Sequence, residues 1–160
     1  MIAYGKMTTS QWPYVTKCST TDGTWTTDTT VAFPIQLSST STGANGHALV
    51  VAQSAAKAVM IYSQANATQT LKAKTWNGSA IGSEETATTT LTKASYYFRA
   101  VAIGDAILLI MLESVTPNIV YTKRTAATAV WAAETTIKAT ASATSGPVIN
   151  VDGKQNLWIY

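Results

Sequence analysis

Short apolar runs and turns alternate along the chain, and three of the apolar segments share one outline. Residues 48–62 (ALVVAQSAAKAVMIY), 99–113 (RAVAIGDAILLIMLE) and 148–160 (VINVDGKQNLWIY) each read as a strand, a tight turn and a second strand. The turns fall at residues 54–57, at Gly104-Asp105 and at residues 152–156. Gly and Asp favour hairpin turns because they tolerate positive φ. The pattern therefore predicts three β-hairpins.

A second outline recurs at residues 14–31, 71–88 and 120–137. Each segment has an alternating strand that ends in a lysine, a short turn, a large apolar residue and, three residues later, an acid. The lysines are Lys17, Lys74 and Lys123, the apolar residues are Trp25, Ile81 and Trp131, and the acids are Asp28, Glu84 and Glu134. Joined to the hairpins, these segments give a repeating unit of four strands in roughly 50 residues.

A repeat of this size predicts an all-β fold of β-propeller blades, each a four-stranded antiparallel sheet. A single sheet cannot bury both of its faces, so the units must stack on one another. We predict one propeller segment over residues 1–160, with approximate repeats 4–61, 62–110 and 111–160. Propellers use about 4 to 8 blades, so three blades leave the ring incomplete within one chain.

The two ends of the chain fall at the same point of the repeat. Residues 1–4 match residues 59–62, and residues 157–160 match them again. Three interpretations stay open. The chain is a piece of a longer protein, or copies of it associate as a homo-oligomer to complete a ring, or it forms an open stack whose edge strands are capped by partners.

The composition agrees with a β-protein and excludes several classes. Charged residues make up 12% and hydrophobic residues 46%, and much of the remainder is Thr and Ser. Thr is β-branched and suits a pleated surface, whereas disordered chains are poor in aromatics and rich in charge. The net charge of +3 is spread without a basic run, so we expect no nucleic-acid partner. No apolar window approaches a membrane span and no apolar leader opens the chain, so we expect no membrane insertion and no signal peptide.

The first repeat carries a motif that resembles a known family. Residues 19–25 (STTDGTW) are similar to a shortened Asp-box, the Ser-x-Asp-x-Gly-x-x-Trp motif of sialidase-type (BNR-like) propellers. The second repeat keeps Trp76-Asn77-Gly78-Ser79 in its turn but has Ile81 in the anchor position, and the third keeps Trp131 without Asp or Gly. The resemblance implies propeller blades of the kind found in lectins, glycosidases and phage structural or adhesion proteins. We expect Trp25, Ile81 and Trp131 to be structural anchors of the repeat, wedged between blades.

The same resemblance argues against catalysis within this chain. A sialidase needs three arginines for the substrate carboxylate, a Tyr nucleophile with a Glu partner, and an Asp acid/base. This chain has only Arg99 and Arg124, and no spacing singles out a Tyr–Glu pair. His47 and Cys18, each the single residue of its type, do not make a zinc site, and no phosphate-binding glycine loop is present. We therefore predict no catalytic residues, no metal and no cofactor.

Aromatic residues near the predicted turns are the candidate ligand-binding groups. Trp12, Trp76, Tyr96 and Tyr97 fall outside the regular phase of the core. Aromatic rings stack on the apolar faces of sugars, while neighbouring polar groups supply hydrogen bonds. These four residues are thus candidates for glycan stacking, and packing between repeats is the alternative role.

From these observations we expect a non-enzymatic structural or adhesion module of a phage or viral particle, placed on the virion or outside the cell. Its partners would be copies of itself, other virion proteins or a surface glycan. One alternative is a carbohydrate-binding lectin whose ring is completed by oligomerisation. A second alternative is a fragment of a sialidase-like glycoside hydrolase with its catalytic residues elsewhere.

Overall fold

The protein, described here by a computed structural model, is all-β with antiparallel sheets throughout the part of the chain that the structure describes. That part comprises residues 1–7, 11–21, 24–27, 33–41, 47–54, 56–64, 70–88, 93–113, 118–126, 128–139, 147–154 and 156–159. Asp22, Gly23 and Asp28, which carry much of the Asp-box resemblance and the first acid of the repeat, lie outside these residues.

The middle of the molecule is a four-stranded sheet in which each strand pairs with the next along the chain. Its strands are β6 (Ala48–Ala52), β7 (Ala58–Ser63), β8 (Leu71–Trp76) and β9 (Glu85–Thr86). Strands β6 and β7 form the first predicted hairpin, which is closed where Gln53 N donates to Lys57 O at 2.9 Å.

A second four-stranded sheet repeats this order. It contains β10 (Lys93–Ile103), β11 (Ala106–Glu113), β12 (Asn118–Thr125) and β13 (Thr135–Ala139). Gly104 adopts φ 54° in the turn between β10 and β11, a conformation that glycine takes without the steric cost of a side chain. This hairpin, too, was predicted from the sequence.

The third predicted hairpin consists of β14 (Ile149–Val151) and β15 (Leu157–Ile159). The Asp152 carboxylate organises its turn, since it accepts hydrogen bonds from Lys154 N at 2.8 Å and Asn156 N at 2.9 Å. The side chains of Asn156 and Trp158 also donate to it, at 2.9 and 3.4 Å. These bonds, with that from the Asn156 side chain the largest cause, lower the pKa of Asp152.

The N-terminal sheet has three strands, in the order β1 (Ile2–Met7), β2 (Gln11–Thr16) and β5 (Ile35–Gln36). The short hairpin of β3 (Cys18–Thr21) and β4 (Thr24–Thr27) is inserted between β2 and β5. Within β2, Val15 is buried toward the middle sheet, so the alternation of a strand turns Trp12 and Tyr14 to the opposite face, where both are half-buried.

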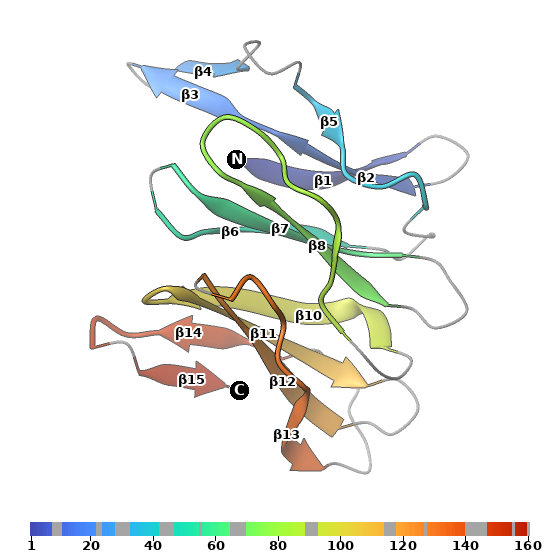
Figure 1. Cartoon of the computed structure of the whole chain (residues 1–160), viewed down its shortest axis with the longest axis vertical. Helices are drawn as coiled ribbons and strands as arrows, with labels where there is room; N and C mark the ends of the chain where they lie inside the picture. Colours follow the sequence, from blue (N-terminus) through green and yellow to red (C-terminus); the bar gives the residue numbers. More distant parts are fainter. Residues whose placement is uncertain are drawn as a thin grey trace.

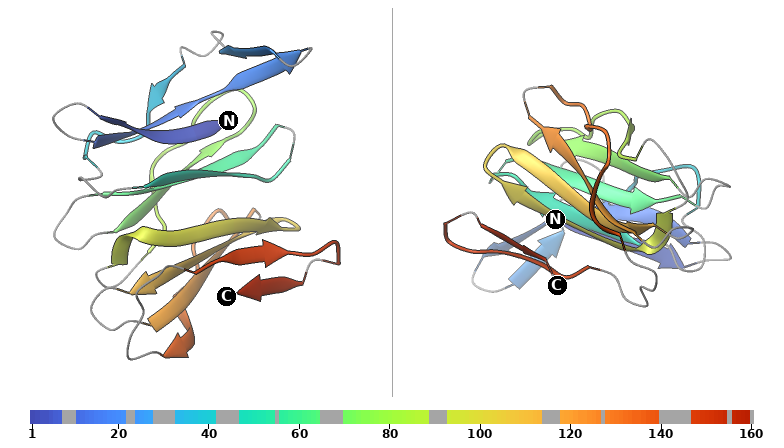
Figure 2. Two further views of the ribbon diagram at one scale, coloured as in Figure 1. Left: turned by 180° about the vertical axis from the view of Figure 1, so that it is seen from behind. Right: turned by 90° about the horizontal axis from the view of Figure 1, so that it is seen from below.

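The three larger sheets lie one above another along the long axis of the molecule (Figure 1), and the reverse view in Figure 2 shows the same order, with the β14–β15 hairpin beside the second four-stranded sheet. Adjacent sheets contact each other through one strand each: β1 contacts β6, β6 contacts β10, and β10 contacts β14. The middle sheet is thus covered on both faces.

Two hydrophobic clusters fill these interfaces, and β7 contributes to both. Met60 and Tyr62 pack against the N-terminal sheet, in a cluster that includes Val15. Val59 and Ile61 point the other way, into a cluster with the second four-stranded sheet. Every residue of β7 is buried, which explains why its sequence shows no polar alternation.

A polar clamp also joins the two four-stranded sheets. Arg124 of β12 makes two hydrogen bonds of 2.7 Å to the carboxylate of Glu85 in β9. The indole nitrogen of Trp131 donates to the same carboxylate at 3.0 Å, and Trp131 forms an isolated β-bridge with Arg124. Arg124 and Trp131 are both buried, so the ion pair lies beside the hydrophobic cluster. We call Glu85, Arg124 and Trp131 the interface clamp.

The prediction of an all-β fold is confirmed, and the assignment of the sheets to propeller blades stays a prediction. Within the described ranges, no helix has the length and apolar character to cross a membrane.

Candidate functional site

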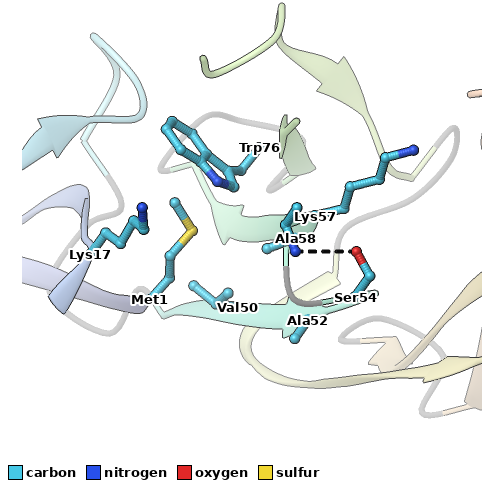
Figure 3. A pocket seen from close by; sticks show the side chains of 9 residues that line it. Met1, Lys17, Val50, Ala52, Ser54, Lys57, Ala58 and Trp76 are labelled. Atoms are coloured by element: carbon cyan, nitrogen blue, oxygen red, sulfur yellow. Dashed lines mark hydrogen bonds between the residues drawn. The ribbon is translucent and has the colours of Figure 1, made fainter. Parts of the chain in front are cut away.

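A pocket of about 300 Å³ opens between the N-terminal sheet and the β6–β7 hairpin. Its apolar side is formed by Met1, Val50, Ala52, Ala58 and Trp76, and its polar side by Lys17, Ser54 and Lys57. Figure 3 shows Met1 and Lys17 reaching toward Trp76 and the Lys57 side chain extending away from it. We call this the Trp76 pocket.

Trp76 is the one sequence-predicted binding residue among the described residues that line this pocket. It is the last residue of β8 and only 4% exposed. Its ring lies 5.6 Å from that of Phe33 at an interplanar angle of 54°, and the Lys17 ammonium stands 5.7 Å from its centroid. A tilted aromatic pair and a cation over a ring are both favourable. Trp76 therefore serves packing between the sheets and also borders the pocket.

Neither Trp12 nor Tyr97 lines this pocket. Trp12 lies on the far face of the N-terminal sheet, half-buried. Tyr97 is half-buried in β10, in the stretch between Lys93 and Phe98 where the pairing register shifts. Tyr96 lies in the same strand, and its side chain is outside the described part of the structure.

The three expected repeat anchors occupy different environments. Trp131 is buried in the cluster between the two four-stranded sheets. Ile81 is half-buried, bridges to Trp76 and packs against the cluster facing the N-terminal sheet. Trp25 lies in β4, and its side chain is outside the described part.

The structure also reveals a polar network that the sequence did not single out. The hydroxyl of Tyr62, which is fully buried, donates to Glu84 Oε2 at 2.7 Å and lies 3.2 Å from Leu37 O. Gln64 Nε2 donates to Ser38 Oγ at 2.9 Å and lies 3.3 Å from the same oxygen of Glu84. The Tyr–Glu pair comes from two elements far apart in the sequence, and only the pairing of the strands brings it together.

The electrostatics of this pair suit a structural donor rather than a nucleophile. Burial of the hydroxyl and, after it, the hydrogen bond and negative charge of Glu84 raise the pKa of Tyr62 far above its ordinary value of 10.0. A tyrosine nucleophile needs the opposite shift, since activation favours the phenolate. Tyr62 therefore remains a neutral hydrogen-bond donor.

His and Cys, two residue types that often bind metals, each occur once in the chain, as His47 and Cys18. No group of three His, Cys, Asp or Glu side chains among the described residues is placed to hold a metal ion. His47 is exposed, and its backbone nitrogen donates to Ser63 Oγ at 3.1 Å. Cys18 lies in β3, paired with Thr27.

Comparison with known proteins identifies no relative. No protein-family model matches the chain, and neither a curated protein nor a solved structure matches it.

Proposed function

We propose that this chain is a non-enzymatic structural or adhesion module of a phage or viral particle, built from propeller blades that further blades complete. The proposal rests on the way in which the sheets stack. The middle sheet buries both faces against its neighbours through the repeated contacts of β1, β6, β10 and β14, as a blade does within a ring.

A second copy of the chain is the partner we favour for completing the ring. The outer face of the N-terminal sheet presents the half-buried Trp12 and Tyr14. At the other end, β14 contacts β10, and Trp158 of β15 and Val148, directly before β14, are exposed. Aromatic and aliphatic faces of this kind are suited to forming one more sheet-on-sheet interface.

The native mass in solution tests this arrangement. Light scattering on a sizing column is expected to give a discrete dimer, twice the 16.9 kDa of the chain. Trp12→Arg places a charge at the proposed interface and should give the monomer. Ala126→Arg, in an exposed turn after β12, is the matched control and should leave the dimer intact. A wild-type monomer, or an open-ended polymer, would contradict completion of the ring by a second copy.

The placement on a virion is supported by the charge-poor, Thr- and Ser-rich composition and by the resemblance to propellers of phage adhesion proteins. Its test is genomic. We expect genes for tail or capsid proteins beside the gene of this protein, and a neighbourhood of carbohydrate-metabolism genes would argue against it.

The Trp76 pocket favours a lectin as the second candidate function. A pocket with an aromatic wall, an apolar floor and a few polar groups at its rim suits one face of a sugar ring. Retention on immobilised sugars is the assay, and Trp76→Phe is the variant. Trp76→Ala would remove a buried ring packed on Phe33, which costs about 3–5 kcal/mol and confounds binding with folding. Because Phe keeps a smaller ring, Trp76→Phe should weaken retention without abolishing it, and a wild-type chain retained on no immobilised sugar would contradict the lectin.

A further inference from the structure

A second pocket on the same inter-sheet seam has a different chemistry. It has a volume of about 410 Å³ and is lined by Gln36, Leu37, Ser38, Ser39, Lys74 and Glu84. The first four belong to β5 and the segment after it, Lys74 belongs to β8, and Glu84 directly precedes β9. We call it the Glu84 pocket.

Hydrogen bonds from buried residues hold the polar side chains that line it in place. Tyr62 and Gln64, both buried, fix Oε2 of Glu84. Ser38 Oγ accepts from Gln64 Nε2 at 2.9 Å and from Thr40 N at 3.0 Å. Polar groups positioned in this way do not have to be ordered when a ligand binds, which lowers the entropic cost of association.

Gln36 extends the same arrangement on the N-terminal sheet. Its Nε2 donates to Ser38 O at 2.7 Å, and its Oε1 accepts from the hydroxyl of Tyr14 at 3.0 Å. The Gln36 amide is therefore oriented by partners on both sides.

Two charged groups of opposite sign face this pocket without pairing with each other. Lys74 is half-buried, and its ammonium makes no hydrogen bond or ion pair to a described residue. Glu84 Oε1 likewise accepts no hydrogen bond from the described part of the chain, whereas Oε2 is held by Tyr62. The pocket therefore offers a charged acceptor, a charged donor and, at Ser39, an exposed hydroxyl.

We propose that the Glu84 pocket binds a neutral saccharide unit, with Glu84 accepting hydrogen bonds from adjacent sugar hydroxyls and Lys74 donating to another. The two formal charges cancel, which favours an uncharged ligand, and the surrounding amide and hydroxyl groups match a polyhydroxylated one. The volume falls within the range of about 300 to 1,000 Å³ of small-ligand sites. This inference deepens the proposed adhesive function, because it gives the module a recognition site and a ligand class.

Titration of the ¹⁵N-labelled full chain with glucose, galactose, mannose and N-acetylglucosamine, followed by amide chemical shifts, tests the proposal. At least one sugar should shift the amides of residues 36–39, 74 and 84 in a saturable manner. Glu84→Gln keeps an oxygen for Tyr62 but removes the charge, and it should weaken binding about tenfold or more, as should Lys74→Gln. Lys72→Gln, on the same strand but bonded to Thr86, and Asp105→Asn, in an exposed turn, are the matched controls and should bind as wild type.

Each other outcome overturns the assignment. No saturable shift with any of the four sugars, or shifts confined to the Trp76 pocket, would exclude a saccharide site at Glu84. If glycine bound more tightly than the sugars, the charges of Glu84 and Lys74 would be a site for a zwitterion instead. The native mass is measured on the same samples, so a dimer that binds no sugar refutes this inference alone, and a monomer that binds sugar refutes only the proposed ring.

Discussion

Removal of the Glu85 carboxylate is expected to destabilise the protein more than removal of an exposed ion pair would. Glu85 accepts two hydrogen bonds of 2.7 Å from Arg124 and one of 3.0 Å from Trp131. The Arg124 side chain is only 6% exposed, and a guanidinium does not lose its proton in a protein. Glu85→Ala therefore leaves a buried charge without its counter-charge.

The size of the effect follows from the burial of the two partners. Breaking a buried pair costs about 3–5 kcal/mol, and because Glu85 is itself 21% exposed, water replaces part of what is lost. We expect about 3 kcal/mol for Glu85→Ala, against a total stability of about 5–15 kcal/mol for a typical domain. Arg124→Met should cost less, about 1–2 kcal/mol, since the remaining carboxylate can be rehydrated.

Urea unfolding followed by tryptophan fluorescence and circular dichroism provides the measurement. With a slope of about 2 kcal/mol/M, Glu85→Ala should lower the midpoint by about 1.5 M. The double variant Glu85→Leu/Arg124→Met should recover most of the loss, because an apolar pair of similar volume replaces the ion pair. Lys72→Ala, which removes an exposed hydrogen bond to Thr86, is the control and should stay within about 0.5 kcal/mol of wild type. A loss below about 1 kcal/mol for Glu85→Ala, or a double variant less stable than Glu85→Ala, would refute the reasoning.

Three further changes have defined outcomes. Tyr62 ionises near pH 10.0 when unfolded but resists ionisation when folded, so its contribution to stability is fully present below that pH and is lost above it. The free energy of unfolding, measured across pH 9 to 11.5, should therefore decline less steeply for Tyr62→Phe than for wild type. Above the unfolded pKa, the two slopes should differ by about 1.4 kcal/mol per pH unit, and parallel curves would contradict this. Gly78→Ala should destabilise by about 1–2 kcal/mol in the same assay, because Gly78 has φ 105° and an added Cβ would lie 3.3 Å from Ala56 O, whereas an unchanged midpoint would show that the turn adapts. Asp152→Asn should loosen the β14–β15 hairpin, seen as faster amide exchange at Lys154 and Asn156, and wild type should show the same change as the pH falls through the lowered pKa of Asp152.

Local patterns in the sequence were sufficient to predict the hairpins. The turns at Gly104-Asp105 and near Asp152 involve residues adjacent in the chain, so their geometry depends on the local residue types. The burial of Trp76 was not accessible in the same way. Asn77-Gly78 beside it signals an exposed turn, whereas the buried ring packs on Phe33, two residues before β5.

The repeat itself also misleads at one point. In the middle sheet, Ser63 pairs with Leu71. When both positions are shifted by the interval that separates Ile61 from Ile110, they become Leu112 and Val120. In the second four-stranded sheet, however, Leu112 pairs with Ile119. A slip of one residue turns the side chains of a strand to the opposite face. Lys74, paired with Met60, consequently faces the N-terminal sheet, whereas Lys123, paired with Leu108, faces away from the corresponding interface. The two lysines match in the sequence and differ in the fold.

The Glu84 pocket could not be read from the sequence for a related reason. Its wall combines the segment after β5 with β8 and the residue before β9, and Tyr62 and Gln64 support it from behind. No motif links these positions, since their proximity depends on how two sheets stack.

Because β7 is completely buried, this single strand separates two hydrophobic cores. A strand packed on one side can shift to fill a cavity, and such relaxation softens the cost of a truncated side chain. Here any shift of β7 toward one core opens a gap in the other, so neither side can relax independently. Truncations at Met60 and Ile61, neighbours in the chain that lie in different cores, should therefore be coupled energetically, and the wall behind Glu84 derives its rigidity from packing on the far side of the sheet.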